Sequence, residues 1–340
     1  MFGLGWLRAL TDARGLLEHA HHGVPRLGEG YTTDDNARAL LYLSLLPEGA
    51  RDEGLVRTYL AFLLHMQKED GRFRNGLTLD GRFEDEGEAE DPTGRAVLAL
   101  AAAQRLPPPY AGPAREALLR ALPALEGFTS LRGRAYALLG LLALPKEPFL
   151  EAAEPLGEGL LRACREAEPA WPYPGPLTYA NHRPVEALYA YGLAFRRQEA
   201  VALARRALAF LKEHYFTPGE EGLFFDPVGN RFMARGRDKP LFDQQPIEAK
   251  CALLAHLRFG ERVLAEVAFL WFHGRNRLRA PLVDAFGPMD GLTPHGPNQN
   301  RGAEALLAYL LAWQALVQGV FPQVDEGVAL GRVFALGGRP

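Results

Sequence analysis

Several residue types and patterns are scarce in this sequence, and each scarcity argues against a class of protein. Only two cysteines, Cys164 and Cys251, occur in 340 residues, so we expect buried thiols rather than a disulfide. No apolar run reaches the roughly 20 residues that a membrane span needs. The formal net charge is only -3, which leaves no basic surface for nucleic acid. The first residues show no basic segment followed by an apolar core, so we expect no signal peptide and a cytoplasmic location.

Lysine and asparagine are also scarce. Lysine and arginine together number 38, of which only five are lysine, and asparagine occurs seven times. Few thermolabile residues and many prolines suit a thermophilic protein, although a GC-rich genome would favour arginine in the same way. A residue that the chain mostly avoids is more informative where it is kept.

The sequence is rich in helical periodicity. Six almost wholly apolar segments alternate with six amphipathic ones. The apolar segments begin near Asp34, Asp91, Ser130, His182, Gln245 and Asn300. The amphipathic segments cover residues 5–21, 52–67, 113–125, 148–167, 199–214 and 261–273. A helix that is apolar on all sides must be buried, so the alternation predicts an all-α fold, an (α/α)6 toroid with an inner and an outer ring.

We expect one toroid domain over residues 1–320 and a C-terminal tail, residues 321–340, that packs on it. Residues 71–83 and 222–232 alternate apolar and polar side chains around turn residues, which predicts small β-hairpin insertions. The links from outer to inner helices are mostly long, so they gather on one rim of the ring. Loops on a rigid scaffold commonly carry function, and we therefore place the site there.

Three aspartates at this rim are candidates for catalysis. Asp35, Asp91 and Asp243 begin inner helices or lie just before them, so their carboxylates should converge above the pore. Repulsion and burial would raise the pKa of at least one, and a protonated and an ionised carboxyl together suit acid–base catalysis. Helix capping explains the same positions without any chemistry.

A sugar ligand is favoured by the loop before the fourth inner helix. It places Trp171 and Tyr173 near His182 and Arg183, so that aromatic faces could stack on a sugar and polar groups could bind hydroxyls. Packing within the loop explains each aromatic equally well. The predicted substrate-binding residues are Asp34, Asn36, Trp171, Tyr173, His182, Arg183, Gln244, Glu248, Asn298, Asn300 and Glu304. No second His or Cys stands at metal-ligand spacing from His182, so neither a metal nor another cofactor is indicated.

Five segments carry a resemblance to a known family. They read YTTDDNARALLYL, DPTGRAVLAL, NHRPVEALYAYG, DQQPIEAK and GPNQNRGAEALLAYLLA. Here the chain resembles a bacterial family of six-hairpin glycosidase-like proteins that often accompany sugar-nucleotide glycosyltransferases. The resemblance covers nearly the whole chain and implies the toroid fold, carbohydrate chemistry and a possible glycosyltransferase partner. It supplies no catalytic residue.

The function that we expect is glycoside hydrolysis by paired carboxylates, with an oligosaccharide or glycoconjugate as ligand. An inverting pair would lie roughly 6.5–9.5 Å apart. A sugar epimerase is one alternative, and it would need His182, His256 or His295 as a base in the pore. Another is a non-catalytic glycan-binding partner of a glycosyltransferase. A weaker one is a relative of terpenoid cyclases, whose Gln-Asp-Gly-aromatic repeats are similar to HMQKEDGRF.

Overall fold

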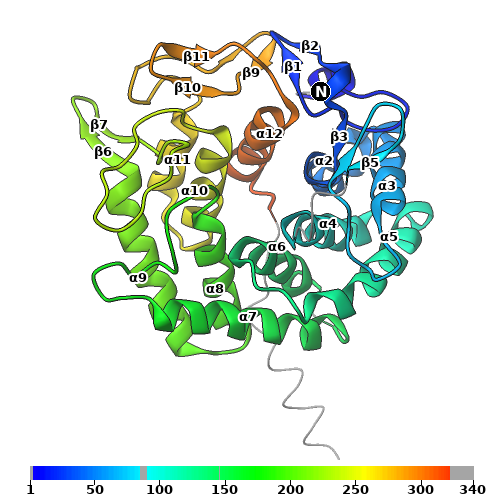
Figure 1. The fold of residues 1–340 in the computed structure, drawn as a ribbon, viewed down its shortest axis with the longest axis horizontal. Coiled ribbons are helices and arrows are strands. Elements are labelled where there is room, and N and C mark those ends of the chain that lie inside the picture. Colours follow the sequence, from blue (N-terminus) through cyan, green and yellow to red (C-terminus); the bar gives the residue numbers. More distant parts are fainter. Residues whose placement is uncertain (1–2, 85–89, 145, 322–340) are drawn as a thin grey trace, which may run out of the picture.

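The computed structural model describes residues 3–84, 90–144 and 146–321, and their helices form two concentric layers (Figure 1). The inner helices are α2 Thr33–Leu45, α4 Glu90–Ala102, α6 Leu131–Leu142, α8 His182–Ala194, α10 Pro246–Arg258 and α12 Ala303–Gln318. The outer helices are α1 Leu4–Ala9, α3 Glu53–Met66, α5 Pro108–Ala121, α7 Phe149–Glu166, α9 Gln198–Tyr215 and α11 Arg262–Leu270. The predicted (α/α)6 toroid is confirmed.

The inner ring is closed. Each inner helix packs against the next one along the chain, and α12 completes the circle against α2. Both cysteines are free and buried, as expected. Among the helices in the described ranges, none has the length and hydrophobicity to cross a membrane.

Glycines set the spacing between α4 and α6. A Cβ atom added at Gly94 would lie 2.4 Å from the backbone oxygen of Gly133. One added at Gly140 would lie 2.7 Å from the Cα atom of Leu98. The two helices can therefore approach this closely only because side chains are absent at these points.

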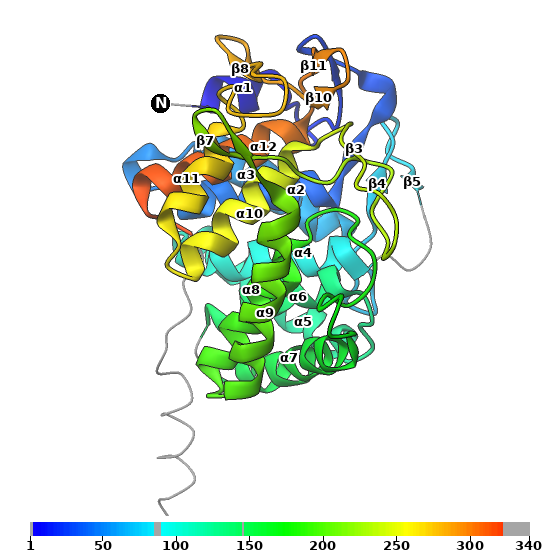
Figure 2. The ribbon, with the colours of Figure 1, turned by 90° about the vertical axis from the view of Figure 1, so that its left-hand side faces the viewer.

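Short antiparallel strands decorate the loops that lead into the inner helices (Figure 2). They are β1 Ala20–His21, β2 Val24–Pro25, β3 Tyr31–Thr32, β4 Gly76–Leu77, β5 Phe83–Glu84, β6 Phe216–Gly219, β7 Gly222–Phe225, β8 Val283–Asp284, β9 Gly287–Pro288, β10 Gly291–Thr293 and β11 Gly296–Asn298. The first predicted hairpin is present as β4 and β5, and β3 pairs alongside β4.

The structure corrects three boundaries. The outer helix expected over residues 5–21 ends at Ala9, and a hairpin with two left-handed residues, His22 and Gly23, follows it. The second hairpin covers residues 216–225 rather than 222–232, because its turn lies between Gly219 and Gly222. Helix α5 begins at Pro108, five residues earlier than expected.

The inner helices are also less apolar than their sequence suggested. Arg38, Arg95 and Lys250 are buried within the ring one helical turn after their helices begin, and Arg183 is buried in the first turn of α8. These long side chains turn away from the hydrophobic layer between the two rings and toward the pore. Residues 322–340, nearly all of the expected tail, lie outside the described residues.

Candidate active site

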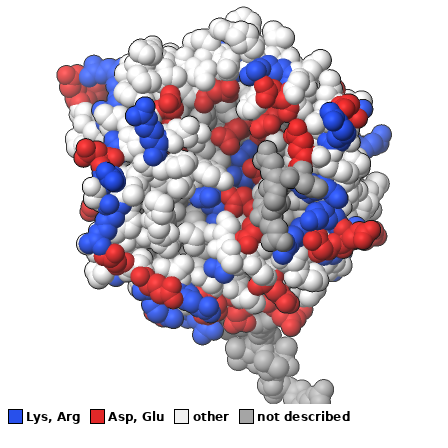
Figure 3. Space-filling model, viewed as in Figure 1, with Lys and Arg blue, Asp and Glu red and all other residues white. Residues whose placement is uncertain are grey.

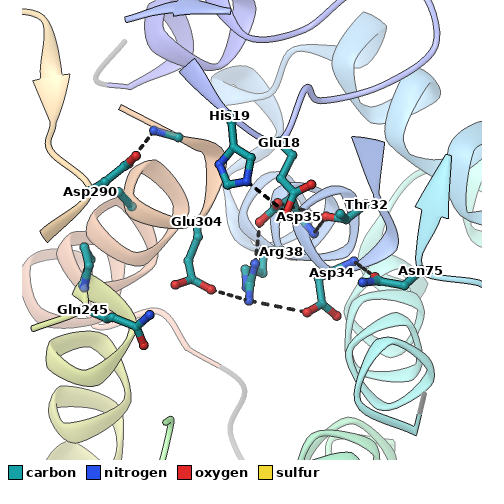
Figure 4. A pocket seen from close by; sticks show the side chains of 13 residues that line it. Glu18, His19, Thr32, Asp34, Asp35, Arg38, Asn75, Gln245, Asp290 and Glu304 are labelled. Atoms are coloured by element: carbon teal, nitrogen blue, oxygen red, sulfur yellow. Dashed lines mark hydrogen bonds and ion pairs between the residues drawn. The ribbon is translucent and has the colours of Figure 1, made fainter. Parts of the chain in front are cut away.

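A cavity of about 270 Å³ opens over the first turns of α2, α10 and α12 (Figures 3 and 4). Its lining is strongly acidic and comprises Glu18, His19, Thr32, Asp34, Asp35, Arg38, Asn75, Gln245, Pro246, Asp290, Gly302, Glu304 and Ala305. A second space of about 490 Å³ adjoins it over α4 and α6. Asp34 and Asn75 line both, so the two spaces form one groove across the mouth of the pore.

Helix α2 is capped by Thr32, so the carboxylates of Asp34 and Asp35 in its first turn are not needed as caps. The Thr32 hydroxyl accepts a hydrogen bond from the backbone N–H of Asp35 at 3.2 Å and therefore caps the helix. The same hydroxyl donates to Oδ2 of Asp35 at 2.9 Å. Neither Asp34 nor Asp35 serves as the cap.

Arg38 joins three carboxylates at the cavity floor (Figure 4). It forms a close ion pair with Asp35, and its Nη2 lies 3.0 Å from Oε2 of Glu304 and 3.8 Å from Oδ2 of Asp34. The oxygens of Asp34 and Glu304 are therefore less than about 7 Å apart. The Nε of Arg95 lies 3.2 Å from the other oxygen of Asp34, so two guanidinium groups contact this carboxylate.

Two acids lining the cavity hold their protons more tightly than usual. Burial raises the pKa of Asp35, and the nearby carboxylates add to the effect although Arg38 opposes it. Burial likewise raises the pKa of Asp290, whose Oδ1 accepts a hydrogen bond from the backbone N–H of Gly302 at 2.5 Å. Burial at the mouth of the pore therefore shifts these two carboxyl groups toward their protonated forms.

Glu18 is the residue that sequence reasoning missed. It lies in the loop before β1 and lines the cavity beside His19, whose Nε2 is 3.4 Å from Oε1 of Glu18. Burial raises the pKa of Glu18 to about 7, and the charge of Asp35 contributes. The amphipathic pattern of residues 5–21 predicts an outer helix over this segment. The turn formers Gly15, Gly23 and Pro25 were the signal against a helix.

Asp91 lies in the adjoining part of the groove and is fully engaged. Its carboxylate accepts hydrogen bonds from Ser130 at 2.6 Å, Arg132 at 2.9 Å and Tyr179 at 2.7 Å. Burial alone would raise the pKa of Asp91, but the Ser130 hydrogen bond and the Arg132 charge outweigh it and the pKa is lowered. The Arg132 guanidinium also stacks 4.0 Å above the Tyr179 ring. Asp91 is thus an ionised anchor for this wall.

Asp243 lies apart from these acids. It is exposed and lines neither part of the groove. Its neighbour Gln244 is buried and bonded to Asp226 and Trp271 at 2.8 and 2.9 Å, which fixes the chain in this orientation. Asp243 therefore does not lie with the other two aspartates, while Asp35 lines the main cavity and Asp91 the adjoining space.

The expected aromatic wall is also corrected, because its residues do not line the groove. Trp171 packs edge-on against Phe210 at 4.8 Å, and its Nε1 donates to the carbonyl of Gly175. Tyr173 is buried in the core. His182 is completely buried against Tyr215, and burial lowers the pKa of His182 well below its usual range. Apolar packing has taken these rings away from the pore.

Of the remaining expected ligand-binding residues, Asp34 and Glu304 line the cavity, and the others make hydrogen bonds or ion pairs within the protein. Asn36 accepts a hydrogen bond from the Leu16 N–H at 2.9 Å and donates to the Thr32 carbonyl at 2.8 Å. Arg183 pairs with Glu186 inside the ring. Backbone and buried hydrogen bonds also hold Gln244, Glu248, Asn298 and Asn300.

Histidines contribute little to this groove. His256 is buried, with Nδ1 2.7 Å from Glu261, and His295 is exposed in the loop between β10 and β11. Only His19 among the described histidines lines the cavity. Within the described ranges, no group of three or more His, Cys, Asp or Glu side chains is arranged to hold a metal ion.

Comparison with known proteins supports the fold. No family model and no curated protein sequence matches the chain. Among solved structures, a D-mannose isomerase is similar with a TM-score of 0.67 at 11% identity, over 93% of this chain and 95% of the other. Cellobiose 2-epimerase from Bacillus thermoamylovorans gives 0.66 at 8% identity, over 91% and 95%. The GH76 α-mannanase of Bacteroides thetaiotaomicron gives 0.62 at 11% identity, over 98% and 95%.

Proposed function

We propose that the protein is a glycoside hydrolase whose general acid is Glu18 and whose second catalytic carboxylate is Asp34. One observation carries this proposal: two carboxyl groups line one cavity in opposite environments. Glu18 is desolvated and lies near Asp35, which raises its pKa to about 7. Asp34 contacts the guanidinium groups of Arg38 and Arg95. Such a divided pair suits acid–base cleavage of a glycosidic bond.

In this proposal Glu18 gives its proton to the leaving oxygen as the glycosidic bond breaks. Asp34 acts on the opposite side of the sugar ring, either through a water molecule or directly on the anomeric carbon. Asp35 is a positioning residue, because it holds Arg38 by a buried ion pair and its charge helps to keep Glu18 protonated.

The shape of the groove agrees with an oligosaccharide substrate. Asp34 stands where its two parts meet, so sugar units could occupy both sides of the bond to be cleaved. On the far side, the stacked pair of Arg132 and Tyr179 offers donors and a ring edge to a further unit. An enzyme that removes only the terminal sugar of an oligosaccharide would need only one of these two parts.

The proposal is tested by incubating the wild type with an oligosaccharide library and analysing the products. We expect cleavage of at least one member, with the anomeric form of the product giving the stereochemical outcome. Glu18→Gln should lower the rate at least ~100-fold, the low end for general acid catalysis. If saccharides bind without any cleavage, the glycan-binding interpretation replaces hydrolysis.

A sugar epimerase remains the second candidate because His19 lies in the cavity beside Glu18. The D-mannose isomerase and the cellobiose 2-epimerase with the same fold make this chemistry relevant. An epimerase that removes a proton from carbon would incorporate deuterium from D2O into the sugar, whereas hydrolysis leaves the carbon-bound hydrogens in place. Mass spectrometry of the products distinguishes the two.

The other expectations from the sequence stay proposals. We propose an oligosaccharide or glycoconjugate ligand, no nucleic-acid partner, a cytoplasmic location and a thermophilic source. A glycosyltransferase partner is proposed only from the sequence resemblance. Co-purification with an enzyme of that class, encoded next to this chain, is the direct check.

A further inference from the structure

Four cationic side chains lie in the pore below its acidic mouth. Arg38, Arg95, Arg183 and Lys250 come from α2, α4, α8 and α10, and none is more than 5% exposed. Arg38 and Arg95 each stand four residues after an aspartate that lines the groove. Lys250 likewise stands four residues after Pro246, which lines the main cavity. Residues at this spacing share one side of a helix, so the cations form a second level beneath the mouth.

Three of these cations have partners, and the fourth does not. Arg38 and Arg95 contact Asp34, Asp35 and Glu304, while Arg183 pairs with Glu186. The Nζ of Lys250 makes no hydrogen bond or ion pair with any residue of the described ranges. Its ammonium group is therefore the unmatched charge of this level.

The position of Lys250 on α10 places it below the mouth of the pore, because it follows the cavity-lining Pro246 by one helical turn. Helix α10 packs between α8 and α12, yet Arg38 on α2 and Arg95 on α4 both act on Lys250. Both helices lie beyond the immediate neighbours of α10 in the inner ring. Burial lowers the pKa of Lys250 to about 7, and Arg183, Arg38 and Arg95 act in the same direction.

The choice of lysine rather than arginine at position 250 also indicates what this position binds. An unpaired buried charge is costly, and the chain uses only five lysines against 33 arginines. Arginine would stay charged at this buried position, whereas lysine can give up its proton there and regain it beside an anion. The position thus suits a group that is neutral when free and cationic when a negative ligand binds.

We propose that Lys250, together with Arg38 and Arg95, binds an anionic group of the saccharide, so that the substrate is an acidic sugar or a sugar phosphate. This inference rests on the proposed site and specifies the substrate class. The acidic mouth does not exclude an anion, because Arg38 and Arg95 offset part of the charge of Asp34, Asp35 and Glu304. A carboxylate and a phosphate share the chemistry that these cations recognise.

The test is calorimetric titration of the wild type, Lys250→Met and Lys68→Met with glucuronate, glucose 6-phosphate and glucose. Lys68 is a matched control, since it is 40% exposed and lies 3.7 Å from Asp70. We expect at least one acid to bind at least 10-fold more tightly than glucose, and this preference should vanish in Lys250→Met alone. Comparison of the two acids identifies carboxylate or phosphate as the preferred group.

Folding and function can be separated in the same experiment. Methionine removes an unpaired buried charge at similar volume, so the melting temperature of Lys250→Met should equal or exceed that of the wild type. If neither acid shows Lys250-dependent binding, the inference is wrong. Cleavage of a neutral oligosaccharide at equal rates by wild type and Lys250→Met would also overturn it but leave the hydrolase proposal intact. Lys250-dependent binding of an acid without cleavage of any saccharide would support this inference but overturn the hydrolase proposal.

Discussion

Arg38 of α2 and Glu304 of α12 meet at 3.0 Å where the first and last inner helices close the ring. The same arginine pairs with Asp35 and lies 3.8 Å from Asp34. One guanidinium group therefore contributes both to the closure of the ring and to the floor of the candidate site. A change at Arg38 should affect both the stability of the ring and the charges that the site presents.

The first prediction is that Arg38→Met strongly destabilises the fold. Breaking a buried ion pair leaves uncompensated carboxylates and costs on the order of 3 kcal/mol. The control is Arg8→Met, which removes an exposed partner of Asp52 and should cost less than about 1 kcal/mol. Urea unfolding at pH 7 measures both values. Equal, small losses would mean that the Arg38 network contributes little to closing the ring.

The second prediction concerns pH and Glu18. A general acid must be protonated, so activity should fall as the pH rises through about 7, the pKa of Glu18. Glu18→Gln should reduce the rate and remove this part of the pH dependence. A profile that keeps its decline near pH 7 in the variant would assign the proton to another group.

Thermal stability gives an independent reading of the same group. The pKa of Glu18 is about 7 in the folded state and near 4.5 when unperturbed, so the folded state binds this proton more tightly. The contribution of Glu18 to stability must then decrease as the pH rises from 4.5 through 7. Glu18→Gln lacks this penalty. Its melting temperature relative to the wild type should increase between pH 5 and pH 8, and a constant difference would contradict the raised pKa.

Periodicity was sufficient to predict the helices but not every side chain that they bring together. Five of the six outer helices lie close to their predicted positions, because an amphipathic stripe reports directly on burial. The segment after Ala9 has such a stripe but lacks the helix, because the turn former Gly15 interrupts it. Gly15 also packs so closely that a Cβ atom there would lie 2.8 Å from Asn36. Local pattern cannot reveal this tertiary contact.

The site was predictable only where its residues begin a helix. Asp34, Asp35 and Glu304 line the main cavity because the first turns of the inner helices converge there. Trp171 and Tyr173 are equally suitable as sequence, yet Tyr173 is buried in the core and the partly buried Trp171 packs against that core. Glu18 comes from a loop whose path depends on hydrogen bonds to Gly30 and Ala303, which no local pattern encodes.

The third prediction is that the aspartates differ in their effect on activity according to their positions relative to the groove. Asp34→Asn should lower activity at least ~100-fold. It should also lower the melting temperature, because it leaves the buried Arg95 guanidinium without its carboxylate partner. Asp243→Asn should retain activity, because Asp243 is exposed and outside the groove. Asp35→Asn and Asp91→Asn should lower activity through altered positioning, and Asp35→Asn should also shift the acidity of Glu18. Loss of turnover in Asp243→Asn alone would reverse this assignment.

The last prediction tests the close contact between α4 and α6. Gly94→Ala places a Cβ atom 2.4 Å from a backbone oxygen of Gly133, and backbone cannot move aside as a flexible side chain can. We expect a loss of about 1–3 kcal/mol from overpacking, even though alanine favours helix more than glycine does. Gly112→Ala is the matched control, since Gly112 lies within α5 and has open space around its Cβ position. That change should stabilise the protein by about 0.5–1 kcal/mol. Chemical unfolding of both variants measures the contrast, and a stabilised Gly94→Ala would show that the two helices are not held this closely.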